Sequence, residues 1–157
     1  VSARVAISET EIEEMAKTML KEAKAIKNKR LNEIESVIKI LELVEQNLIG
    51  AYAAQFAFMY ELSKLGVLDL SRQEMIDIIT NDEEKLKGEI LEWLMAFSHM
   101  AYAPMSDEEF RVYNDFSKSD LGILLNKALF SVYNEMAKDQ SQSLANILGE
   151  FMKSEDL

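Results

Sequence analysis

The single histidine, His99, is the residue whose chemistry could most directly support a reaction, because an imidazole can act as a general base. Ser98 stands beside it, but neighbouring residues on a helix point about 100 degrees apart, so helical geometry alone does not make Ser98 its nucleophile. We interpret His99 as a structural or surface residue and expect no enzymatic activity. A hydrolase that uses His99 with a nearby carboxylate is a third hypothesis for the function.

Three acidic groups could suggest a metal site, at residues 9–14, 82–84 and 107–109. Calcium loops need alternating oxygen ligands with a central glycine, and di-iron bundles need Glu-x-x-His pairs, and neither pattern occurs in the sequence. Negative charge at the positive end of a helix dipole explains all three groups. With no cysteine and no glycine-rich phosphate loop, the sequence predicts neither a metal nor a cofactor.

A surplus of large apolar side chains on two predicted helices is the feature that best suggests a binding function. These side chains simply fill the core, or some of them line a groove or cavity for a partner helix or an apolar ligand. The candidate interface or pocket residues are Tyr52, Phe56, Met59, Trp93, Phe97 and Tyr102.

Start and stop signals in the sequence define the helices that carry these residues. Pro104 lacks an amide hydrogen and disfavours the helical conformation at Ala103, so the helix that carries Trp93 should end there. A serine followed three residues later by a glutamate predicts a reciprocal capping box at a helix start. Such pairs are Ser8 with Glu11, Ser71 with Glu74, and Ser106 with Glu109. Ser119 is a further cap, and Gly122 suggests a close approach of backbone or side chain.

Apolar residues at helical spacing predict helices throughout the chain. The first runs over about 9–28, and the second persists over 32–66, with a kink expected near 47–50 and a C-cap at Gly66. Polar stretches at 28–30, 80–82 and 139–143 could each be a break or an exposed turn. With short loops and no strand pattern, the sequence predicts an all-α, mostly antiparallel bundle of about five to six helices.

The region around these caps resembles a known family. The residues that carry the likeness are Ser106-Asp107-Glu108-Glu109, then Phe116-Ser117-Lys118-Ser119-Asp120-Leu121-Gly122, then Leu125-Asn126-Lys127-Ala128-Leu129-Phe130, and the ending 151–157. This pattern resembles the signature of the DUF2059 family and is clearest over residues 90–157. The chain departs from it with Ser117, where a second aromatic is usual, and with Asp120, where proline is usual; both Asp and Pro suit the first turn of a helix.

The resemblance implies a helical, exported bacterial protein, and therefore a periplasmic or secreted location. The family is named for its unknown function, so no catalytic residue can be carried over from it. Members of this branch are often longer, so the resemblance also implies that the chain corresponds to a C-terminal part.

Length and charge limit the partners. At 157 residues the chain fits a single domain over 1–157. A net charge of −11 argues against nucleic acid as the main partner, and no apolar run reaches the ~18 residues that would span a membrane. We expect a non-enzymatic helical protein with an interaction or structural role in the bacterial envelope, through a protein partner or a homo-oligomer. The alternative is a carrier that binds a lipid or another hydrophobic small molecule in the bundle core.

Overall fold

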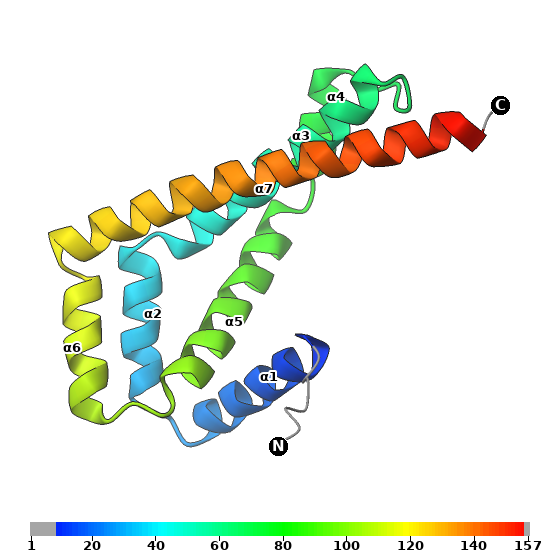
Figure 1. The fold of residues 1–157 in the computed structure, drawn as a ribbon. Coiled ribbons are helices and arrows are strands. Elements are labelled where there is room, and N and C mark those ends of the chain that lie inside the picture. Colours follow the sequence, from blue (N-terminus) through cyan, green and yellow to red (C-terminus); the bar gives the residue numbers. More distant parts are fainter. Residues whose placement is uncertain (1–8, 156–157) are drawn as a thin grey trace, which may run out of the picture. The chain divides into compact units, whose positions relative to one another are not determined.

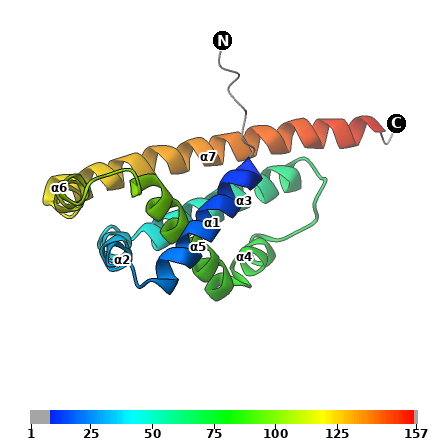
Figure 2. The same cartoon turned by 90° about the horizontal axis from the view of Figure 1, so that it is seen from below.

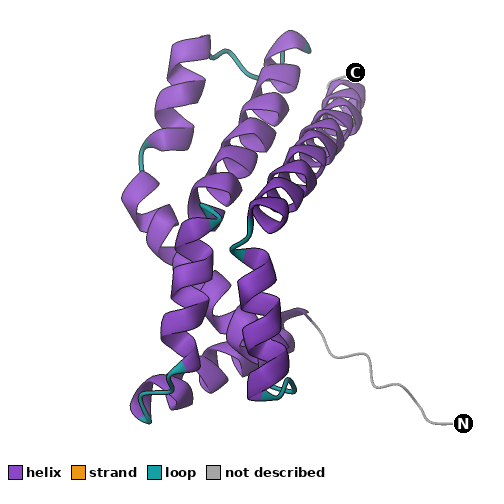
Figure 3. Cartoon of the chain, turned by 90° about the vertical axis from the view of Figure 1, so that its left-hand side faces the viewer, coloured by secondary structure: helices purple, strands orange, loops and turns teal. Residues whose placement is uncertain are grey.

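The computed structural model describes residues 9–155, which form seven α-helices and no strand (Figures 1 and 3). The helices are α1 (Glu9–Ala25), α2 (Arg30–Ile40), α3 (Leu43–Lys64), α4 (Arg72–Thr80), α5 (Glu83–Tyr102), α6 (Asp107–Ser117) and α7 (Asp120–Glu155). The all-α class is confirmed, and the number of helices in this part of the chain is higher than the five to six that we predicted.

One break that we did not predict, at Glu42, accounts for the higher number, whereas the break at Lys27 lies where the first predicted helix ends. Lys27 and Glu42 both adopt a left-handed backbone conformation, with φ of 53° each, and they end α1 and separate α2 from α3. The kink expected near 47–50 was therefore placed too late, and α3 continues through it. The stretch 80–82 is a break, whereas 139–143 lies within the uninterrupted α7.

The residues group into two compact units by the distances between their Cα atoms. The described part of unit 1 comprises residues 9–43 and 89–123, and that of unit 2 comprises 44–88 and 124–155. The single domain over 1–157 stays a prediction.

The core of unit 1 is built from apolar residues of α1, α2, α5 and α6. Its buried residues are Ala16, Leu20 and Ala23 of α1, Leu31, Ile34, Val37 and Ile38 of α2, Leu94, Met95 and Ala96 of α5, and Phe110 of α6. In α1 and α2 the three- and four-residue spacing places these residues on one side of the helix, whereas the buried residues of α5 are consecutive and cover a broader part of its circumference. Helices α2 and α6 lie side by side, and Asn114 of α6 donates to the carboxylate of Glu33 at 3.0 Å (Figure 1).

The predicted helix ends are largely confirmed. Capping boxes are present at Ser71 and Ser106, and α5 ends at Tyr102, two residues before Pro104. Gly66 follows α3 with a φ of +75°. The Ser8 cap lies outside the described residues.

In unit 2, α7 runs alongside α3 and parallel to it (Figure 2). Gly50 of α3 faces Asn134 of α7, and fifteen residues further along both helices Leu65, just beyond α3, faces Gly149. Because the contacting residues advance by fifteen positions toward the C-terminus on both helices, the two helices run parallel. This pair is thus an exception to the antiparallel arrangement that short loops favour, because three other helices separate α3 from α7 in sequence.

Candidate functional site

The six predicted site residues divide equally between the two units. Tyr52, Phe56 and Met59 lie on α3 in unit 2, all partly exposed. The Phe56 ring stacks on Tyr60 with centroids 5.9 Å apart, and the guanidinium of Arg72 lies 5.5 Å from its centroid. These contacts give Phe56 partners within unit 2.

The Tyr52 hydroxyl donates to the carboxylate of Glu83 at 3.4 Å. Burial raises the pKa of Tyr52, and the negative charge of Glu83 raises it further. Hydrogen bonding to Lys87 lowers the pKa of Glu83 in turn. Tyr52 is therefore a neutral hydroxyl donor that ties α3 to the first turn of α5.

Trp93, Phe97 and Tyr102 lie on α5 in unit 1. The Trp93 and Phe97 rings are 4.7 Å apart, and Trp93 remains 46% exposed. Tyr102 instead packs on α6, with ring centroids 5.7 Å from Phe110 and 5.1 Å from Tyr113. Trp93 is thus accessible, whereas Tyr102 belongs to the contact between α5 and α6.

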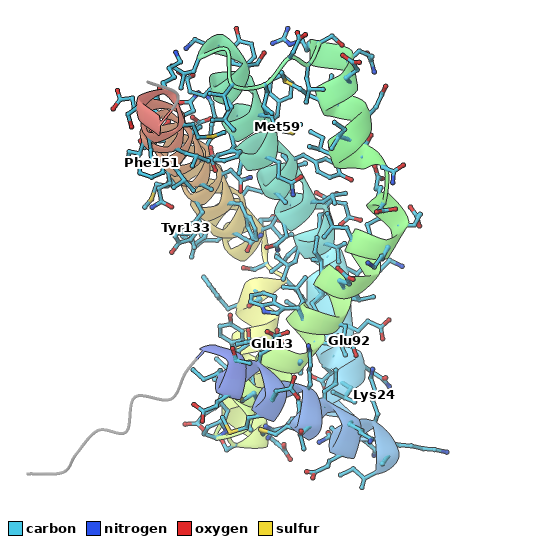
Figure 4. All side chains as sticks on the ribbon, turned by 90° about the vertical axis from the view of Figure 1, so that its right-hand side faces the viewer. Glu13, Lys24, Met59, Glu92, Tyr133 and Phe151 are labelled. Atoms are coloured by element: carbon cyan, nitrogen blue, oxygen red, sulfur yellow. The ribbon has the colours of Figure 1, made fainter. Side chains whose placement is uncertain are left out.

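The largest set of exposed apolar side chains lies on α7. We define the outer face of α7 as Leu125, Leu129, Val132, Tyr133, Met136, Leu144, Ile147, Leu148 and Phe151, whose exposed fractions range from 38% to 68%. Helical spacing places all of them on one side of the helix. Figure 4 shows Tyr133 and Phe151 on the side of α7 that is turned away from α3.

The opposite, inner side of α7 carries small and polar residues. A Cβ at Gly50 of α3 would lie 2.3 Å from the Oδ1 of Asn134, and a Cβ at Gly149 would lie 2.5 Å from the Cδ1 of Leu65. Ala145 is completely buried. Small side chains allow this close packing, and the large apolar side chains of α7 are left on the outside.

Summed over its two halves, residues 125–136 and 144–151, the outer face exposes more apolar area than the largest patch of an ordinary monomer. At these exposed fractions, and with roughly 150–250 Å² for a large apolar residue, it presents on the order of 900 Å² to solvent. The largest patch on a typical monomer is about 300–600 Å². This size makes the outer face of α7 the candidate site of the chain.

The apolar period of α7 is visible in the sequence, but we did not predict an interface there. Periodicity shows that one side of a helix is apolar, and it does not show whether a neighbour covers that side. The available signal was the opposite side, where Asn134, Ala145 and Gly149 leave room for a close neighbour. A long helix with a small, polar face and an apolar face has two packing surfaces.

A second apolar feature is a hollow of about 460 Å³ on α6 in unit 1. Met105, Glu108, Glu109, Val112, Tyr113 and Phe116 line it. Its volume lies in the range of small-molecule sites. None of the six predicted site residues is among these lining residues.

His99 lines a smaller hollow of about 330 Å³ in unit 1. Its other lining residues are Asn28, Arg30, Ile34, Tyr102 and Ala103, and none of these is a carboxylate. Burial lowers the pKa of His99, and the positive charge of Arg30 lowers it further. The imidazole is therefore neutral at pH 7.

Arg30 holds the turn between α5 and α6, a contact that the sequence analysis missed. Its guanidinium donates to the carbonyl oxygens of Met105 at 2.9 Å and Tyr102 at 3.2 Å, and it pairs with Asp107. It also lies 5.0 Å from the centroid of the Phe110 ring. Each of the three guanidinium nitrogens of Arg30 therefore donates a hydrogen bond within the fold.

Within residues 9–155, no three or more His, Asp or Glu side chains are grouped so that they could hold a metal ion. In the same part of the chain, no helix combines the length and the apolar character that crossing a bilayer requires. Comparisons of the chain with models of protein families, with curated proteins and with solved structures found no match.

Proposed function

We propose that this chain is a non-enzymatic interaction protein that binds a helical segment of another polypeptide on the outer face of α7. The observation that carries this proposal is the division of α7 into two faces. Its inner side packs on α3 through small and polar residues, and its outer side exposes large apolar residues.

The size and composition of the outer face support a protein partner. A specific protein interface buries about 800 Å² on each side, and the roughly 900 Å² of the outer face meets that requirement. Aromatic residues concentrate binding energy in such interfaces. Tyr133 and Phe151, exposed at 61% and 57%, are the residues we assign to this role.

Site-specific photocrosslinking in cells tests the proposal. A benzoyl-phenylalanine at position 133 should give a discrete protein adduct, because it replaces Tyr133 in the centre of one half of the outer face. The matched control is the same group at position 131, since Ser131 is exposed on the same helix but outside that face. Equal adduct yields at the two positions would contradict the proposal.

The proposal also covers the location of the protein in the bacterial envelope and the antiparallel arrangement of its helices. We propose a mostly antiparallel bundle and a DUF2059-like, periplasmic or secreted protein, supported by the all-helical fold and by the likeness over residues 90–157. Fractionation of the source bacterium tests the location. Recovery of the protein in the cytosol alone would rule it out.

A carrier of a hydrophobic small molecule is the second candidate, and the α6 hollow favours it. Native mass spectrometry of freshly purified protein should then show a bound mass of a few hundred daltons, as for a ligand that fills about 460 Å³. Val112→Glu should remove the bound mass, because Val112 lines the hollow, and Arg111→Gln on the same helix should retain it. Protein that carries no added mass would eliminate this candidate.

A further inference from the structure

We infer that the outer face of α7 binds a second copy of this chain, with the two α7 helices antiparallel about a twofold axis at Gln140. This inference rests on the proposed function, which it deepens by naming the partner. Its basis is a symmetry in the spacing of the exposed residues.

Eight of the nine residues of the outer face, all except Leu125, are arranged symmetrically around Gln140. The residues nearest the centre line of the face are Leu129, Tyr133, Met136, Gln140, Leu144, Ile147 and Phe151. Their successive steps are four, three and four residues before Gln140, and four, three and four after it. The spacing therefore reads the same in both directions along the helix.

This symmetry is what pairing with an identical, antiparallel helix requires. A twofold interface uses the same patch on both subunits, so each residue must suit the residue at the mirrored position. With Gln140 on the axis, Leu129 lies opposite Phe151, Tyr133 opposite Ile147, and Met136 opposite Leu144. Each of these pairs joins two large apolar side chains.

Gln140, the polar residue at the centre, fixes the register of the two helices in this arrangement. Gln140 is exposed, and in this arrangement its amide faces the amide of its own copy. Two such amides can donate to and accept from one another, as a single buried polar residue does when it fixes the register of a coiled coil. A shift by one turn would place each amide against an apolar side chain.

Area and charge agree with a second copy as the occupant. Each copy offers on the order of 900 Å², close to the about 800 Å² per partner of a stable complex. None of the seven centre-line residues is charged, so no charge is buried along the centre line of the pairing. An unrelated helix would have to match this spacing by its own sequence, whereas a second copy matches it by symmetry.

Disulfide crosslinking of the full chain tests the arrangement. Because the sequence contains no cysteine, only the introduced cysteines can form a disulfide. A mixture of Leu129→Cys and Phe151→Cys chains should give a disulfide-linked heterodimer in high yield. Leu129→Cys alone should give at least about tenfold less, because the two copies of residue 129 lie at opposite ends of the interface. Efficient self-linking at 129 without linking to 151 would show parallel helices and would overturn the inference.

Charge swapping at the axis is the second measurement. Gln140→Glu and Gln140→Lys should each weaken the homodimer by about tenfold or more, because like charges meet across the axis, and an equal mixture of the two should restore it. Sedimentation velocity reads the mass, and circular dichroism checks that the helices remain. Unchanged dimerisation of both variants would overturn the twofold at Gln140.

The outcomes separate this inference from the proposed function. A chain that is monomeric at all concentrations, yet forms an adduct with a different protein at position 133, overturns the second copy and leaves the interaction role standing. A monomer without any adduct at position 133 overturns both.

Discussion

Gly122 and Gly88 are both helical glycines, and their surroundings give them opposite roles. A Cβ at Gly122 would lie 2.1 Å from the carbonyl oxygen of Phe116 and 2.8 Å from that of Ser117. The backbone cannot move aside as a flexible side chain can, so Gly122 is required for the tight turn between α6 and α7. Gly88 on α5 has nothing within 4 Å of such a Cβ.

Substituting these two glycines should therefore change stability in opposite directions. Gly88→Ala should raise the free energy of unfolding by about 1 kcal/mol, because alanine is the better helix former. Gly122→Ala should lower it by about 1–3 kcal/mol through overpacking against backbone. Urea unfolding measures both, and a stabilising Gly122→Ala would contradict the close approach.

The partly buried His99 makes stability depend on pH. Burial and the charge of Arg30 lower its pKa below the ordinary 6.5, so the unfolded chain binds the proton more readily than the folded one. The stability contributed by a neutral His99 is complete above about pH 6.5 and is lost as the pH falls through the lower, folded pKa. The other lining side chains of its hollow are Asn28, Arg30, Ile34, Tyr102 and Ala103, of which Arg30 carries a charge.

His99→Gln should reduce the loss of stability between about pH 7 and pH 5. Unfolding experiments at the two pH values compare the variant with the unaltered chain. An NMR titration reads the imidazole directly, and a His99 pKa at or above 6.5 would contradict the burial argument.

At the scale of helices, Arg30 joins the start of α2 to the turn between α5 and α6. Its donors meet the carbonyl oxygens of Tyr102, at the end of α5, and of Met105, in the turn that follows. Arg111 is a useful contrast. It is an exposed arginine whose ion pairs within residues 9–155 join it to neighbours on its own helix, Glu108 and Asp115.

Arg30→Ala should lower the free energy of unfolding by about 2–3 kcal/mol, because it removes charged hydrogen bonds to partly buried carbonyls. Arg30→Lys should recover only part of this loss, since an ammonium cannot reproduce the planar fork. Arg111→Ala is the control and should change stability little. Comparable losses for Arg30→Ala and Arg111→Ala would refute the role of Arg30.

These contacts also show what can be predicted from the sequence. The capping boxes at Ser71 and Ser106 are confirmed because all of their parts lie within four residues. The break at Glu42 was misplaced because a non-glycine residue adopts the left-handed conformation there, which no local signal marks. The outer face of α7 was missed because exposure depends on which neighbour packs against the helix, and Gly50 and Asn134 that decide it are far apart in sequence.

At the scale of the whole molecule, a strongly acidic chain carries a large apolar face. With a net charge of −11, two copies repel each other at long range, while the contact between their outer faces is apolar. Salt screens the repulsion and leaves the apolar contact intact. The dimer should therefore be tighter at high salt than at low salt, opposite to an interface held by ion pairs.

Sedimentation velocity from about 0.05 M to about 0.5 M sodium chloride measures this, since the Debye length falls from about 14 Å to about 4 Å over that range. We expect the dimer dissociation constant to decrease severalfold, and the thermal midpoint to rise with protein concentration, because dimerisation stabilises the folded chain.

The double variant Tyr133→Glu with Ile147→Glu should lose both dependences, because it places charge in the outer face. Its control, Gln55→Glu with Ser131→Glu, adds the same charge at exposed positions outside that face and should keep them. A dimer that weakens with salt would show that ion pairs, and not the outer face of α7, hold the two copies together.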